Sequence, residues 1–130
     1  MLLLTISPGQ EVLTEVEAQL RERGITDAAV ASLIGAVDAC AISNMDAADP
    51  GKDIITEYEQ PFELSGTGEI TKGRAHLHVV LGKQGDSALA GHLQWARVEN
   101  FFVHAYVIVL DDTEIVRNTI PAANPQRTLI

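Results

Sequence analysis

One helical pattern followed by a long succession of strand-like runs is the feature that most constrains how this chain folds. Near the amino terminus, Leu13, Val16 and Leu20 recur at helical spacing. From residue 28 to residue 110 the apolar runs are short, and glycines separate many of them. Short strands at this spacing are typical of an antiparallel or mixed sheet rather than of parallel βαβ units. We therefore predict an α+β fold, with an antiparallel-rich mixed β-sheet and one helix packed on it.

The helix is predicted over residues 8–23. Ser7 is a candidate N-cap, Pro8 suits the first helical position, and Gln10 stands where a capping box places its Glu or Gln. Gly24 follows the last turn, as at many helix ends. We expect the face that carries Leu13, Val16 and Leu20 to pack on the sheet.

The strands are predicted from their apolar runs. Residues 2–6 lack the basic flank and cleavage site of a signal peptide, so we expect a strand there. Gly35 inside a long run indicates a bulge or a close backbone approach. The last run is apolar on both faces, which favours either a core strand or a contact with another subunit. The predicted strands are 2–6, 28–42, 54–58, 62–67, 75–81, 93–96 and 98–110.

Length and composition indicate one folded domain. The chain has 130 residues, of which 46% are hydrophobic and 21% charged, which excludes long disorder. We expect a single domain over residues 1–120 and an irregular tail over 121–130. No apolar run approaches the roughly 20 residues that span a bilayer, so we expect no membrane partner. Cys40 is the one cysteine, which permits no internal disulfide and fits a cytoplasmic location.

The charge of the chain is acidic but unevenly distributed. The net charge is −9, which makes the chain a poor generic binder of nucleic acid, because such binding relies on Lys and Arg. Residues 72–97 are the exception, since four basic side chains there stand against Asp86 alone. This segment could be a solvated loop, or its Lys72 and Arg74 could hold a small anionic ligand.

Three of the four histidines lie within this basic segment. His76 and His78 are two residues apart in a predicted strand, so their side chains share one face. The turn at 83–86 can bring His92 opposite them. Three neutral imidazoles with an open position suit a divalent metal such as zinc. The alternative is a set of structural histidines that form hydrogen bonds with one another and with the backbone.

The remaining sequence offers little chemistry. The chain contains no nucleophile motif and no phosphate-binding loop, so we assign no catalytic residue. His104 shares a strand face with Phe102 and Tyr106. A structural role is favoured for it, while a role as a fourth metal ligand or as a ligand-binding pocket wall stays open.

Several short motifs occur in a recognisable order, at residues 7–11, 32–37, 41–44, 61–70, 73–78 and 91–93. Together they resemble the PPC domain (plants and prokaryotes conserved domain, DUF296) in its stand-alone prokaryotic form, over roughly residues 3–110. The resemblance implies a sheet with a packed helix, assembly as a homotrimer, and a metal site at His76, His78 and His92. Relatives often carry Thr-x-Glu where this chain has His104-Ala105-Tyr106.

The resemblance also implies DNA binding, because family members commonly carry that label. The plant form follows a basic AT-hook, R-G-R-P, which this chain does not contain. We therefore expect a non-enzymatic regulatory module with a zinc-like site. DNA is its candidate partner, although the missing AT-hook and the net charge of −9 argue against direct binding. The alternatives are a metal-dependent enzyme or sensor for a small anion, held by Lys72, Arg74 or His104, and a structural trimer without a ligand.

Overall fold

The structure, a computed structural model, describes residues 1–116. Within them, eight strands form a single sheet, in which every neighbouring pair is antiparallel. The predicted α+β fold with an antiparallel sheet and one helix is confirmed. The predicted tail 121–130 lies outside the described residues. The elements are β1 (Leu2–Ile6), α1 (Val12–Glu22), β2 (Ala28–Val37), β3 (Ala39–Met45), β4 (Asp53–Tyr58), β5 (Phe62–Thr71), β6 (Arg74–Lys83), β7 (Ser87–Arg97) and β8 (Val103–Val109).

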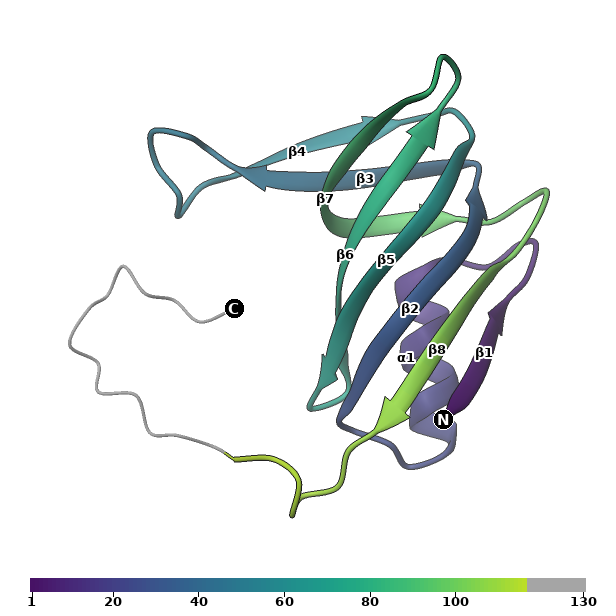
Figure 1. The fold of residues 1–130 in the computed structure, drawn as a ribbon, viewed down its shortest axis with the longest axis vertical. Coiled ribbons are helices and arrows are strands. Elements are labelled where there is room, and N and C mark those ends of the chain that lie inside the picture. The colour runs from purple at the N-terminus through teal and green to yellow at the C-terminus, as the bar shows by residue number, and fades with distance from the viewer. Residues whose placement is uncertain (117–130) are drawn as a thin grey trace.

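The strand order across the sheet is β1-β8-β2-β5-β6-β7-β3-β4. Helix α1 covers one face, which we call the inner face, and packs against β1, β6 and β7 (Figure 1). Val16 and Leu20 are buried in this contact as predicted, whereas Val12 takes the buried place expected for Leu13. The opposite face, which we call the outer face, carries half-exposed side chains such as those of Ile34 and Val80. The hydrophobic core therefore lies on the helix side of the sheet alone.

The helix begins at Val12 rather than at residue 8, so the predicted amino-terminal bound is wrong. Ser7 and Gln10 do form a reciprocal pair, in which the Ser7 amide donates to Gln10 Oε1 and the Gln10 amide to the Ser7 carbonyl. Gly9 lies between them in the left-handed region, at φ +92°, and keeps this turn out of the helix. Glu11 is the actual N-cap, and its carboxylate accepts from the Leu13 and Thr14 amides.

The run predicted as one strand over 28–42 is two strands, β2 and β3, separated at Asp38. The first pairs with β5 and β8, the second with β4 and β7, so the chain changes neighbours at this residue. The Asp38 carboxylate accepts from the backbone amides of Glu99 and Asn100. No charged residue other than Asp38 lies in the run 28–42, so the sequence gives only a weak sign of the break.

The bounds of several later strands also differ from the prediction, and β5 runs to Thr71 rather than ending at residue 67. β7 begins at Ser87, well before residue 93, and β8 begins only at Val103 because residues 98–102 form a loop. Gly35 marks a close approach, as expected: a Cβ there would lie 2.0 Å from the Phe102 carbonyl oxygen. The last strand is buried on its inner face only, through Val103, Ala105 and Val107.

The β3–β4 hairpin extends beyond the rest of the sheet as an arm (Figure 1). Its strand β4 has exposed side chains on both faces, including Ile54 and Ile55 at 50% and 56%. Met45 at the end of β3 is exposed as well. Over residues 1–116, the structure has no helix with the length and apolar character that a membrane span requires.

Candidate metal centre

Two adjacent strands bring the three histidines together on the outer face. In β6, Leu77 and Val79 point into the core, so the alternating His76 and His78 point outward. The turn between β6 and β7 sets the pairing so that His92 lies directly opposite His78. Sheet periodicity and hairpin register thus place three imidazoles on one small area.

The imidazole nitrogens converge closely. One ring nitrogen from each of His76, His78 and His92 can be chosen so that all three lie within 4.8 Å of one another. The Nε2 atoms of His76 and His78 are 3.1 Å apart. The ring centroids are 4.9 to 5.6 Å apart. Because neutral imidazole is a common ligand of zinc, this donor set fits a divalent cation with part of its coordination left open.

Glycines allow the neighbouring backbones to approach this cluster. Gly66 and Gly68 in β5 lie beside the histidine-bearing part of β6, and a Cβ on either would come within 2.3 Å of a histidine carbonyl oxygen. A Cβ on Gly91 would lie 2.8 Å from the Ser43 carbonyl oxygen in β3. The positions of both histidine-bearing strands, β6 and β7, therefore depend on the absence of side chains at these glycines.

Carboxylates are the charged groups nearest to the histidines. Glu69 Oε1 lies 3.4 Å from His76 Nδ1, which leaves the other ring nitrogen facing the cluster. Burial and the repulsion of His76 and His78 lower the pKa of His92, against an opposing effect of Asp53. Two hollows flank the rings: one of about 640 Å³, which Asp53 also lines, and one of about 330 Å³ beside Glu69.

The basic residues of the segment 72–97 do not gather around the cluster. The Arg74 guanidinium pairs with Glu17 of α1 at 3.5 Å, and Arg97 pairs with Glu59 and Glu99. Lys72 lies in the β5–β6 turn with a positive φ of 50°. Acidic partners thus pair with two of the four basic side chains in this segment, and two of these partners, Glu17 and Glu59, come from distant parts of the chain.

His104 lies on the outer face as predicted but away from the cluster. Strands β2 and β5 separate its strand from β6, a spacing of about 14 Å. Its ring packs on Phe102 at a centroid distance of 4.4 Å and meets Tyr106 edge-on. His104 therefore cannot serve as a fourth ligand to the cluster of its own chain.

Sequence reasoning did not connect Asp53 and Glu69 with the histidines. Glu69 could have been found, because the short β5–β6 turn places it opposite His76 in an ordinary hairpin register. Asp53 gave no such signal, since its strand pairs only with β3 and reaches the site through the sheet order.

Within residues 1–116, the protein is a small α+β domain, in which one helix packs on an eight-stranded antiparallel sheet and a histidine cluster lies on the uncovered face. Residues 1–112 match the Plants and Prokaryotes Conserved (PCC) domain. The chain belongs to this family, which is the one that the sequence motifs indicated. No curated protein matches the chain.

Solved structures agree with this assignment. A metal-containing protein from Archaeoglobus fulgidus is 32% identical, with a TM-score of 0.68 over 83% of this chain and 78% of that one. A plant- and prokaryote-conserved protein from Pyrococcus horikoshii has a TM-score of 0.74 at 21% identity, over 85% and 79% of the two chains. A candidate DNA-binding protein from Ralstonia eutropha JMP134 has a TM-score of 0.72 at 22% identity, over 83% and 76%. The last two likenesses concern the fold alone.

Proposed function

We propose that this chain is a metal-binding regulatory module in which His76, His78 and His92 hold one zinc-like divalent cation. The observation that carries this proposal is the convergence of three ring nitrogens within 4.8 Å. The metal-containing protein from Archaeoglobus fulgidus, which is 32% identical to this chain, supports it. The identity of the metal as zinc rests on the chemistry of the donor set.

Two acidic residues beside the cluster, Glu69 and Asp53, would support metal binding by the histidines. Glu69 contacts Nδ1 of His76 and so directs Nε2 toward the cluster. A zinc ion bound by three imidazoles would supply an open position that can accept a further donor. Asp53 and Glu69 give the surroundings negative charge, which disfavours the alternative of an anionic substrate held by Lys72 and Arg74. A binding role therefore fits better than the enzymatic alternative.

Metal analysis of the purified protein tests the proposal. We expect about one ion per chain after growth with zinc, and loss of that ion in His78→Ala. His104→Ala is the matched control, because it removes an imidazole from the same face outside the cluster and should keep the ion. Equal metal content in the two variants, or none in the native protein, would leave the structural-histidine alternative as the better account.

We further propose that the protein assembles as a homotrimer. Its support is apolar surface at two places, the arm with Met45, Ile54 and Ile55, and Leu3 and Ile108 on the outer face. Side chains of this size rarely remain exposed together on a monomer. Light scattering coupled to size exclusion should give three times the chain mass, and Ile55→Asp should lower it. A native mass equal to one chain would refute the assembly.

DNA is the second partner to be tested. The similar protein from Ralstonia eutropha is a candidate DNA-binding protein. In this chain, the net charge of −9 and the pairing of Arg74 and Arg97 with carboxylates disfavour contacts to DNA phosphates. A gel shift at low salt decides the matter, because electrostatic binding is strongest there. We expect no shift. The cytoplasmic location stays a prediction that rests on the single cysteine, Cys40.

A further inference from the structure

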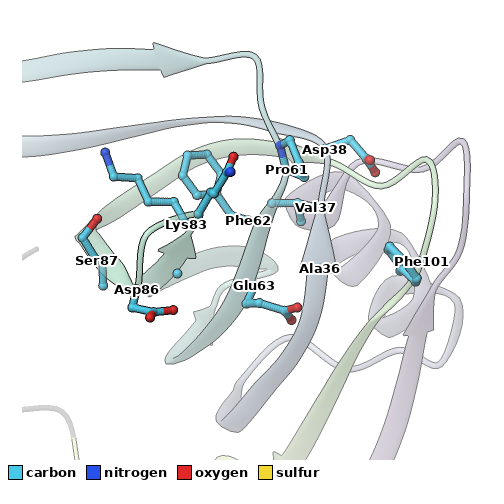
Figure 2. A pocket seen from close by; sticks show the side chains of 13 residues that line it. Ala36, Val37, Asp38, Pro61, Phe62, Glu63, Lys83, Asp86, Ser87 and Phe101 are labelled. Carbon is cyan, nitrogen blue, oxygen red and sulfur yellow. The ribbon is translucent and has the colours of Figure 1, made fainter.

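A groove lies at the end of the outer face that is remote from the histidine cluster. It consists of two adjoining hollows of about 540 and 450 Å³ that share Ala36, Glu63 and Phe101, and we call it the end groove. The first hollow runs from the β6–β7 turn past the start of β5 to Phe101 (Figure 2). The second continues from Phe101 to His104. Glu63 is six residues from Glu69 along β5, or about 20 Å. The end groove is thus separate from the proposed metal site.

Two phenyl rings form one wall of this groove. Phe101 is 63% exposed and Phe102 is 45% exposed, although both are large apolar side chains. Hydrogen bonds fix the backbone that carries them. Asp38 accepts from the amides of Glu99 and Asn100 just before the rings, and the Ala36 amide donates to the Phe102 carbonyl. The wall is therefore preorganised rather than a flexible loop tip.

The hydrogen bonds to Asp38 also favour the charged form of its carboxyl group. Desolvation acts to raise the pKa of the Asp38 carboxyl, but the hydrogen bonds from Asn100 and Glu99 outweigh it, so the pKa lies below its ordinary value. Its oxygens are committed to the loop amides and to the Asn100 side chain. Asp38 therefore holds the wall in place and adds negative charge at the rim.

The floor of the groove is made of small residues. Gly35 and Ala36 in β2, Gly82 in β6 and Ala88 in β7 line it. These residues leave room above the sheet between the phenyl wall and the β6–β7 turn. A hollow with an apolar wall and few polar groups is the usual form of a small-molecule site.

Glu63 supplies the charge in the middle of the groove. Among residues 1–116, its carboxylate takes part in no hydrogen bond or ion pair. Figure 2 shows its side chain extending from β5 toward β2, while the Lys83 side chain extends away from it. Asp38 and Asp86 add further negative charge, so acidic groups outnumber the one lysine. Charge complementarity thus calls for a cationic occupant.

We propose that the end groove binds a small organic ammonium ion with an apolar body. The ammonium head lies against the Glu63 carboxylate, and the body lies against the rings of Phe101 and Phe102. A phenyl face also attracts a cation directly, which adds to the attraction by the carboxylate. His104 forms the far wall, the pocket role that the sequence left open.

Amide NMR of the complete protein, titrated with 2-phenylethylammonium chloride, tests this proposal. Saturable shifts are expected at residues 34–36, 63 and 101–104. Phenylacetate, which has a similar body and the opposite charge, should produce none. Glu63→Gln should weaken binding about three- to tenfold, as expected for an exposed charge pair. Phe101→Ala should weaken it as well, because it removes half of the aromatic wall.

Glu57→Gln is the matched control, since it removes the same charge from exposed β4, outside both hollows. It should leave the affinity unchanged, because Glu57 does not line the groove. The proposal is overturned if Glu63→Gln and Glu57→Gln weaken binding equally, if phenylacetate binds as tightly as the cation, or if no shift saturates at millimolar concentrations.

Discussion

Replacing Gly68 by alanine should displace the strand that carries two of the histidines. A Cβ at this position would lie 2.2 Å from the His76 carbonyl oxygen and 2.9 Å from Leu77 Cα. Since both atoms belong to the backbone, β5 and β6 must separate by about 1 Å to restore an ordinary contact. Overpacking costs about 1–3 kcal/mol, and the weakened ladder about 1 kcal/mol more. The lower entropy of the unfolded alanine chain returns about 0.5 kcal/mol.

The net loss in free energy of unfolding is then about 1.5–3.5 kcal/mol, or roughly 5–13 °C in Tm for a domain of this size. Thermal unfolding followed by circular dichroism, without metal, measures it. Gly82→Ala is the control, because its Cβ would meet Glu63 Cβ at an ordinary 3.5 Å. It should change the free energy of unfolding by less than about 0.5 kcal/mol. Equal Tm values for the two variants would refute the reasoning from close backbone approach.

Three other predictions follow from single contacts. Glu69→Gln should weaken zinc affinity about tenfold in a competition titration while Tm without metal stays the same, because the carboxylate orients His76; unchanged affinity would contradict this. Glu11→Ala should lower the free energy of unfolding in urea by about 2 kcal/mol, because its carboxylate caps α1 and also accepts from the Ala96 amide in β7; a loss below half of that would count against the double role. Burial raises the pKa of the Cys40 thiol from 9.0 to about 11, so the contribution of Cys40 to stability is constant below about pH 9 and falls as the pH rises toward 11, because the thiol of the unfolded chain ionises first. Urea unfolding at a series of pH values should show this fall in the native protein and a smaller one in Cys40→Ala.

Where the sequence predicted the fold correctly, a local signal agreed with the tertiary structure. The period of Val16 and Leu20 identified the helix, and alternation in 75–81 identified the central part of β6. Where prediction was wrong, the deciding contacts came from distant segments. Glu11, and not Ser7, is the N-cap of α1, and its carboxylate is also held by β7 through the Ala96 amide. The break at Asp38 depends in the same way on amides 61 and 62 residues further along the chain.

In the candidate site, too, local sequence signals predicted some features, while contacts with distant segments determine the others. The common face of His76 and His78 follows from strand periodicity alone, and the position of His92 follows from one hairpin turn. The surroundings could not be derived locally. Arg74 is basic in the sequence, yet its charge is paired by Glu17 from the helix. Asp53 approaches His92 only because β3 and β4 follow β7 in the sheet order.

The three imidazoles all belong to the single hairpin formed by β6 and β7, and this has a consequence for how the site assembles. A growing polypeptide possesses every donor as soon as His92 has been synthesised, and both strands of the hairpin are complete at Arg97, before β8 exists to complete the sheet. The intervening loop between His76 and His92 is short, so joining its ends costs little chain entropy. A metal ion bound by these histidines, as proposed, would join β6 and β7 before the last strand is made, and nascent-chain folding would then depend on the supply of zinc.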